Sequence, residues 1–155
     1  MDEAVQRTAP GGAEPQDEVE QEAHELRRAL GLVSRRVRAE RGSADLPDPQ
    51  FNVLALLARH GVMTPGQLAE RERVQPPSMT RTVTCLADRG LVAKQENPAD
   101  GRKVLVELTE AGRTEVSETK RRRDAWLAGR LAGLSAHDRA CLAQAVVLLD
   151  RIARS

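Results

Sequence analysis

The stretch that decides the fold is P76-P77-S78-M79-T80-R81-T82-V83-T84-C85-L86-A87-D88-R89-G90. Its two prolines suit the first turn of a helix, because the backbone N–H groups of that turn have no partner within the helix. Each residue turns a helix by about 100°, so Met79, Val83 and Leu86 share one side, which can anchor the helix to a core. Gly90 suits the left-handed conformation in which many helices end. The sequence therefore predicts a helix that runs from the prolines to Arg89.

The opposite side of this helix carries small, hydroxylated and cationic side chains. Four residues fall there, namely Pro77, Arg81, Thr84 and Asp88, and the flanks hold Ser78, Thr80 and Cys85. An arginine can donate two hydrogen bonds to guanine, whereas serine and threonine can bond phosphates or base edges. The positive end of the helix also favours phosphate near its first turn. A surface of this kind predicts a helix that enters a groove of DNA.

Two further helices are predicted before this one. Asp48, followed by Pro49, is a typical start for the first, and Gly61 is a typical end. The apolar face of that helix consists of Phe51, Leu54, Ala55 and Ala58. The second begins with the capping box T64-P65-G66-Q67 and runs to about Arg71. Two short helices joined by a tight turn, residues 72–75, indicate a helix-turn-helix.

A β-hairpin is predicted after the glycine that ends the third helix. Its strands are expected at residues 91–97 and 102–108, and Asp100-Gly101 between them is a strong signal for a hairpin turn. One face of the second strand is fully apolar and carries Val104, Val106 and Leu108. A hairpin directly after a helix-turn-helix indicates the winged form of that motif.

The wing places an acid and two bases around its turn. Asp100 lies two residues before Arg102, and Lys103 follows. An unrestrained arginine loses rotamer entropy when it binds, and a nearby carboxylate can hold its guanidinium in place. We therefore expect Arg102 to enter a minor groove or contact its phosphates, with Asp100 as the orienting group. The alternative is an ordinary hairpin with a solvated ion pair, which would contribute less than about 1 kcal/mol.

The chain ends are expected to be helical as well. A narrow apolar seam predicts a first helix that ends near Gly42, and it consists of Val19, Ala23, Leu26, Leu30, Val33 and Val37. Thr109 caps a helix expected to reach about Gly129, and Ser135 with Asp138 caps the last one. The last helix has two adjacent apolar seams, which are Cys141, Ala145, Leu148 and Ile152, and Leu142, Val146, Leu149 and Ala153.

So broad an apolar face must be covered on two sides, which a chain of 155 residues has little means of doing alone. We therefore predict a homodimer formed by helices at about 17–41 and 110–154. The alternative is that the last helix lies in the core of its own chain. The expected fold is mainly α with a small β-hairpin wing, in which a winged helix-turn-helix at about 48–108 belongs to a single domain, 16–155, preceded by a disordered tail, 1–15.

Composition and charge limit the possible functions. The chain has one Phe, one Trp and no Tyr, so its core must be aliphatic. No apolar run approaches the roughly 18 residues that a membrane helix needs, and the two cysteines lack metal-binding spacing. We expect a cytoplasmic protein without a metal or cofactor. The net charge of +1 conceals an acidic segment at 1–25 and basic segments at 26–41 and 71–103, and basic segments attract polyanions.

The basic run K120-R121-R122-R123 is expected to be a solvated face that complements the acidic N-terminal segment of a partner chain. Possible linings for a ligand pocket are His24, Arg27, Arg28, His60 and Trp126. A lone histidine on a helix is, however, more often a surface residue than a ligand contact. A specific ligand site is therefore not predicted from these residues.

Several short motifs together resemble the MarR family of winged-helix regulators. They are S78-M79-T80-R81, then L86-A87-D88-R89-G90-L91-V92, then D100-G101-R102 with L108-T109-E110-A111-G112. The resemblance covers about residues 17–154. It implies a homodimer with a recognition helix in each of two major grooves and wings in the flanking minor grooves. It also implies that Ser78, Thr80 and Arg81 are recognition contacts, Arg102 the wing arginine and Asp100 its support.

The predicted function is a sequence-specific, homodimeric repressor that binds a pseudo-palindromic DNA site and is released by a small ligand, as many members of this family are. The predicted DNA contacts are Pro77, Ser78, Thr80, Arg81, Thr84, Asp100, Arg102 and Lys103. No phosphate-binding loop, nucleophile elbow or carboxylate pair predicts an enzyme. The alternatives are a ligand-independent or nucleoid-type DNA binder and a winged helix that docks on proteins.

Overall fold

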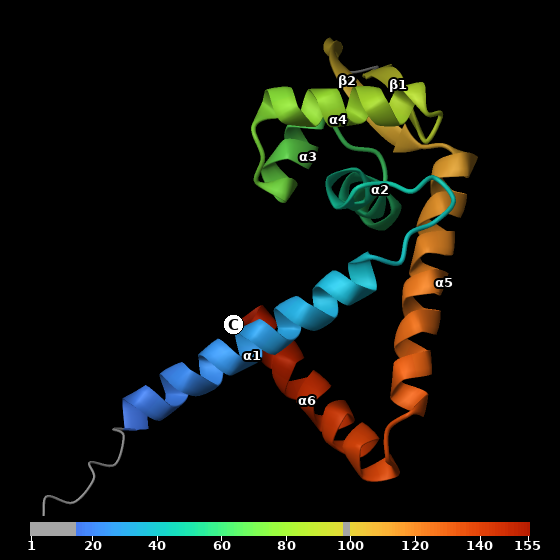
Figure 1. Ribbon diagram of the computed structural model, residues 1–155. Helices are drawn as coiled ribbons and strands as arrows, with labels where there is room; N and C mark the ends of the chain where they lie inside the picture. Colours follow the sequence, from blue (N-terminus) through green and yellow to red (C-terminus); the bar gives the residue numbers. More distant parts are fainter. Residues whose placement is uncertain (1–14, 98–99) are drawn as a thin grey trace, which may run out of the picture. The chain divides into compact units, whose positions relative to one another are not determined.

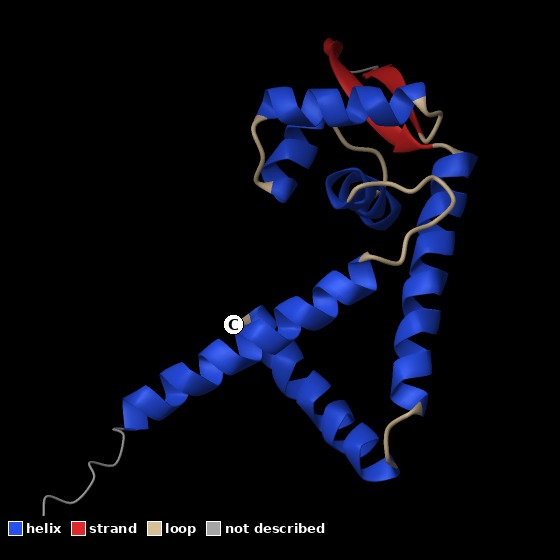
Figure 2. Ribbon diagram, in the orientation of Figure 1, coloured by secondary structure: helices blue, strands red, loops and turns tan. Residues whose placement is uncertain are grey.

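The computed structural model describes the backbone of residues 15–97 and 100–155 and the side chains of residues 16–96 and 104–155. Figures 1 and 2 show a mainly helical chain with one described hairpin, which confirms the predicted fold class. Contacts divide the chain into two units, with the boundary between Arg36 and Val37. The predicted tail lies, apart from Pro15, outside the described residues.

The first helix, α1, spans Pro15–Arg38. Its apolar seam is exposed, as the side chains of Val19, Leu26, Leu30 and Val33 show. The helix ends four residues before Gly42, where the sequence predicted its end. The backbone N–H groups of Gly42, Ser43 and Ala44 bond to side chains of a later helix, so they are not available to continue α1.

Three helices form the helix-turn-helix region. They are α2 (Asp48–His60), α3 (Pro65–Glu72) and α4 (Pro76–Asp88). The predicted capping box is present, because Thr64 Oγ1 accepts from Gln67 N–H at 3.2 Å while Gln67 Oε1 accepts from Thr64 N–H at 2.9 Å. Gly61 and Gly90 adopt positive φ angles of 78° and 69° at the two predicted helix ends.

The wing consists of β1 (Val92–Asn97) and β2 (Asp100–Leu108), which pair antiparallel. Asn97 pairs with Asp100, so residues 98–99 connect the strands and lie outside the described backbone. The predicted turn at Asp100-Gly101 is therefore wrong, because both residues already belong to β2. A register shift between Glu96 and Asn97 accommodates the extra residues of β2 at this end.

A compact aliphatic core joins the helix-turn-helix to the wing. Its fully buried side chains include Val53, Leu54, Leu68, Leu86 and Val106. Phe51 and Leu54 are buried on α2 as predicted, but Ala58 is exposed and Leu57 is buried instead. The apolar face of β2 is only partly covered, because Val106 and Leu108 are buried whereas Val104 is exposed.

The last two helices are α5 (Glu110–Ala132) and α6 (Ala136–Arg154). Thr109 accepts from Gly112 N–H and Ser135 accepts from Asp138 N–H, so both predicted caps are present. Gly129 does not end α5, which continues to Ala132. No residue of α6 is buried within this chain. The prediction of two apolar seams is consistent with this exposure, and the exposed residues include Leu142, Val146, Leu148 and Ile152.

The loop before α2 is tied to α5 by a cluster of hydrogen bonds. Glu115, only 4% exposed, accepts from the N–H of Ala44 at 2.9 Å and from the hydroxyl of Thr119 at 3.2 Å. The hydroxyl of Ser43 donates to Glu118. Buried polar groups must find partners because burial without them is unfavourable. These bonds therefore fix the path of the loop along α5.

The basic run on α5 is not uniformly solvated, which corrects the sequence expectation. The guanidinium of Arg123 lies over the ring of Phe51, 4.3 Å from its centroid. It also donates from Nε to the carbonyl oxygen of Glu40 at 3.1 Å and lies 3.6 Å from Asp48 Oδ1. Neighbouring residues of the run are more exposed, so Arg123 alone was misjudged: it continues the buried stripe of Val116 and Thr119 on α5, which packs against α2.

Candidate nucleic-acid interface

The recognition helix α4 presents one face outward because the other is anchored in the core. Met79, Val83 and Leu86 are at most 2% exposed, as their helical spacing predicted. The predicted contact residues of this helix are all exposed, and they are Pro77, Ser78, Thr80, Arg81 and Thr84. The fold therefore brings them together on one accessible surface, which is defined here as the outer face of α4.

Hydrogen bonds set the orientation of the hydroxyl groups on α4. The hydroxyl of Thr80 donates to the carbonyl oxygen of Pro76 at 3.0 Å. Thr84 is held differently, because its Oγ1 accepts from Nζ of Lys94 at 3.0 Å. Lys94 belongs to β1, so this bond connects the recognition helix to the wing. The sequence did not single out Lys94, since only the folded register brings it to α4.

The inner flank of α4 is tied to α2 and to the loop before it. Arg89 donates to the amide oxygen of Gln50 at 3.4 Å and to the carbonyl oxygen of Ala44. Gln50 in turn lies 3.4 Å from the sulfur of Cys85, which is half-buried. Cys85 thus faces α2 rather than the centre of the outer face. These contacts position the C-terminal part of α4 relative to the rest of the motif.

The helix-turn-helix carries further cations outside α4. Arg71 and Arg73 are exposed at the end of α3, and Arg73 adopts a left-handed conformation with φ 54° in the turn that leads to α4. His60 lies 3.3 Å from Arg71. Partial desolvation and then the positive charges of Arg71 and Arg59 lower the pKa of His60 below its ordinary value. The neutral imidazole is therefore favoured in this basic environment.

The tip of the wing is only partly described. The backbone of Asp100, Arg102 and Lys103 belongs to β2, which places these residues at the free end of the hairpin. Their side chains lie outside the described part of the chain. The expected pairing of Asp100 with Arg102, and the DNA contacts of all three residues, therefore remain predictions.

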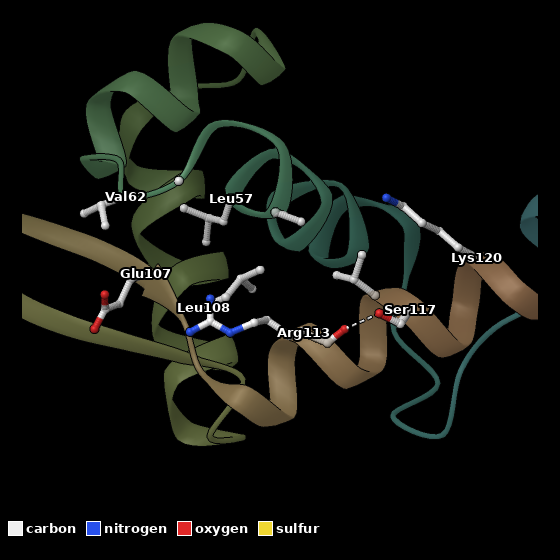
Figure 3. Close-up of a pocket in the computed structure, with 10 residues that line it drawn as sticks. Leu57, Val62, Glu107, Leu108, Arg113, Ser117 and Lys120 are labelled. Carbon is white, nitrogen blue, oxygen red and sulfur yellow. Dashed lines mark hydrogen bonds between the residues drawn. The ribbon is translucent and has the colours of Figure 1, made fainter.

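A cavity of about 400 Å³ lies beside the base of the wing (Figure 3). Its lining comes from the end of α2, the end of β2 and one side of α5, and consists of Leu57, Ala58, Gly61, Val62, Glu107, Leu108, Arg113, Val116, Ser117 and Lys120. Arg113 and Lys120 supply two cations at its edge. Of the possible lining residues suggested by the sequence within this unit, His60 and Trp126 do not border it. The cavity could not be predicted because three separate segments form it.

Among the described side chains, those of residues 16–96 and 104–155, no group of three or more His, Cys, Asp or Glu residues could hold a metal ion. None of the helices in the described residues is long and apolar enough to cross a membrane.

Comparison with known proteins identifies the group to which this fold belongs. The sequence profile of the MarR family matches residues 46–104. An HTH-type transcriptional regulator of Mycobacterium bovis is 44% identical over 127 residues, which is 82% of this chain and 89% of the relative.

Two solved structures resemble the chain over most of its length. A putative transcriptional regulator of Pseudomonas aeruginosa superposes with a TM-score of 0.79 at 28% identity, covering 90% of this chain and 99% of the other. BpsR of Bordetella bronchiseptica, whose DNA binding is regulated by 6-hydroxynicotinic acid, gives a TM-score of 0.61 at 28% identity, covering 86% and 98%. With its outward-facing recognition helix and its wing, the chain therefore belongs to the MarR family of transcriptional regulators, which bind DNA and are not enzymes.

Proposed function

We propose that the protein is a sequence-specific repressor that binds a pseudo-palindromic DNA site as a homodimer. In this proposal α4 enters a major groove, and the wing reaches the adjacent minor groove. The outer face of α4 is the observation that carries the proposal. It combines an exposed arginine, Arg81, with small hydroxylated residues above a fully buried anchor, so that the helix can approach base edges without a bulky apolar obstacle.

The terminal helices support the homodimer. No residue of α6 is buried within the chain. Its large apolar side chains Val146, Val147 and Ile152 are each more than half exposed. The seam of α1 is exposed as well, with Val19 and Val33 as examples. Contiguous exposed apolar surface is unfavourable in water and marks interaction sites. A second copy of the chain would cover both helices and would match the two-fold symmetry of a palindromic site.

Release by a small organic acid is the second part of the proposal. The cavity at the base of the wing is large enough for a small ring compound, and Arg113 and Lys120 could pair with its carboxylate. The cavity is lined by residues of both β2 and α5, so a bound ligand could alter the position of the wing relative to α5. The relative from Bordetella bronchiseptica, whose DNA binding is regulated by 6-hydroxynicotinic acid, supports a ligand of this chemical class.

Selection of bound duplexes from a random DNA pool at near-physiological salt tests the first part. Wild type should enrich a two-fold symmetric motif, and Arg81→Ala should lose or relax it. Arg121→Ala is a suitable control, since it removes an exposed arginine of α5 and should enrich the same motif as wild type. No enrichment by wild type, with only weak binding that disappears as salt rises, would instead favour a nonspecific binder or a protein-docking module.

A thermal-shift experiment with small aromatic acids tests the second part. A ligand that binds only the folded protein raises its melting temperature. 6-Hydroxynicotinic acid is the first probe, and a rise that is lost in Arg113→Gln would support the cavity as its site. If such acids neither raise the melting temperature nor weaken binding to the selected duplex, the protein is a ligand-independent DNA binder with respect to this class of compound.

A further inference from the structure

We propose that Lys94 is a DNA-contacting residue, which binds the phosphate strand between the two grooves and is positioned there by Thr84. The proposal rests on the binding mode proposed above, in which α4 occupies the major groove and the wing the minor groove. It adds a contact that lies in neither of the two elements predicted to read DNA, the outer face of α4 and the wing tip.

The register of the hairpin shows that Lys94 is on its core-facing side. Lys94 pairs with Val106, and Val92 pairs with Leu108. Directly opposite residues of an antiparallel pair share a face, and so do residues two apart on one strand. The other three residues of this set are buried, so Lys94 borders an apolar cluster, and the next pair along the same face, Glu96 and Val104, is exposed.

The side chain of Lys94 must therefore carry its charge away from the core. A lysine in this situation buries its aliphatic stem and extends its ammonium into water. The ammonium emerges beside α4, where Nζ donates to Thr84 Oγ1 at 3.0 Å. Thr84 is itself exposed on the outer face. The ammonium of Lys94 therefore lies next to the outer face of α4, which faces DNA in the proposed binding mode, and not on the far side of the hairpin.

That far side has a different character. Gln95, the next residue of β1, faces it and donates from its side-chain amide to Glu107. This face of the hairpin is therefore acidic or neutral where the pair lies. The side that carries Lys94 lies next to the recognition helix, because α4 and β1 are in contact (Figure 1).

The ammonium has unused capacity for a phosphate. It carries three N–H donors, and Thr84 accepts one of them. The hydroxyl of Thr84 is neutral, so this hydrogen bond does not neutralise the charge of the ammonium. The acid Asp88 lies on the same face of α4 as Thr84, one turn further on, so a local cation also offsets a charge that would repel the duplex.

The position of Lys94 matches a fixed feature of duplex DNA. Each edge of the major groove is separated from the neighbouring minor groove by one sugar–phosphate strand. A helix in the first groove and a wing in the second must straddle that strand. The junction between them, where Lys94 meets Thr84, therefore faces phosphates, and phosphate contacts fix the register of a protein on DNA without reading sequence.

The dependence of binding on salt tests this assignment, with the duplex selected by the wild-type protein as the probe. Each phosphate contact contributes about 0.9 to the slope of log K against log salt. Lys94→Gln should thus lower the slope by about 1.8 for a dimer with two copies of the contact. The preference for the selected duplex over a scrambled one should stay unchanged, and Lys94→Arg should restore the slope.

Two further variants separate a contact from a merely structural role. Thr84→Val keeps the charge of Lys94 but removes its anchor, so affinity should fall while the slope stays close to that of wild type. Arg121→Gln removes one positive charge from α5 and should leave the slope unchanged. If Lys94→Gln also leaves the slope unchanged while wild type binds its duplex, the inference is wrong, although the proposed function stands. If wild type selects no duplex, the proposed function itself fails.

Discussion

The backbone N–H of Gly42 donates a hydrogen bond to Oγ1 of Thr119 at 2.9 Å, although the two residues are 77 positions apart in the sequence. The close approach of the two segments leaves no room for a side chain at Gly42. A Cβ atom there would lie 2.6 Å from that oxygen and 2.3 Å from Glu115 Oε1. Both acceptors are buried, so they have little room to withdraw. A larger residue at this position would force the buried side chains of Glu115 and Thr119 to shift.

We expect Gly42→Ala to lower the free energy of unfolding by about 1–3 kcal/mol, since it forces a close contact and disturbs buried hydrogen bonds. Urea denaturation would measure the loss. Gly129→Ala is the matched control. Nothing lies within 4 Å of the corresponding Cβ on α5, and alanine in a helix interior is more stable than glycine by about 0.5–1 kcal/mol. Equal stability of Gly42→Ala and wild type would mean that Glu115 and Thr119 can move aside.

The pair Ser43–Glu118 should make the stability of this loop depend on pH. The hydroxyl of Ser43, followed by Arg122, lowers the pKa of Glu118 below its ordinary value of 4.5. A carboxyl group whose pKa is lower in the folded state stabilises the fold at pH values above its pKa in the unfolded state. This stabilisation is lost as the pH falls through its pKa in the folded state. Wild type should thus exceed Glu118→Gln in melting temperature above pH 4.5. The difference should shrink as pH falls below it, and a constant difference would contradict the prediction.

Arg123 should contribute more to stability than its neighbours in the basic run. Arg123→Met removes the interaction with the ring of Phe51 and the bond to the carbonyl oxygen of Glu40. A loss of about 1–2 kcal/mol in the free energy of unfolding is expected. Arg121→Met, at an exposed position of the same helix, should change stability by less than about 0.5 kcal/mol. Similar losses for the two variants would show that Arg123 is not held by these contacts in solution.

Arg81 should decide which base is preferred at one position of each half-site. Arg81→Ala is expected to weaken binding to the selected duplex by about 1–3 kcal/mol for each half-site and to relax the preference at that position. Titration of wild type and variant against duplexes that carry each of the four base pairs there would measure both effects. An equal loss of affinity for all four would indicate a phosphate contact instead of a base contact.

Arg102 at the wing should contribute affinity without a large part of the specificity. Arg102→Ala is expected to reduce affinity and to lower the salt slope by about 0.9 for each wing. Binding isotherms over a series of salt concentrations would provide the slope. Asp100→Asn supplies a useful comparison, because it keeps Arg102 but removes the expected orienting charge, so affinity should fall with little change in slope. An unaltered slope for Arg102→Ala would remove this residue from the DNA interface.

The parts of the fold that depend on neighbouring residues were predictable. The buried anchor of α4, the capping box at Thr64 and the glycine ends at Gly61 and Gly90 follow from periodicity and from local hydrogen bonds. The outer face of α4 follows from the same periodicity. Such features need no knowledge of the tertiary structure, because each is determined within a few residues of the chain.

The errors occurred where distant segments meet. The end of α1 was misplaced because the N–H groups near Gly42 bond to α5. The hairpin turn was misplaced because strong turn residues, Asp100-Gly101, are absorbed into a strand with shifted register. Lys94 was missed for the same reason, since its relation to Thr84 exists only once the wing packs against α4.

The threonines of α4 differ in what they can still offer to a base pair. The hydroxyl of Thr80 donates its hydrogen bond to the carbonyl oxygen of Pro76, so toward a base its free lone pairs can only accept. Thr84 uses a lone pair for Lys94 and keeps its proton, so it can donate. Amino groups of adenine and cytosine suit the first hydroxyl, while carbonyl oxygens of guanine and thymine suit the second. Two identical side chains, one turn apart, thus present opposite hydrogen-bonding polarity to the groove.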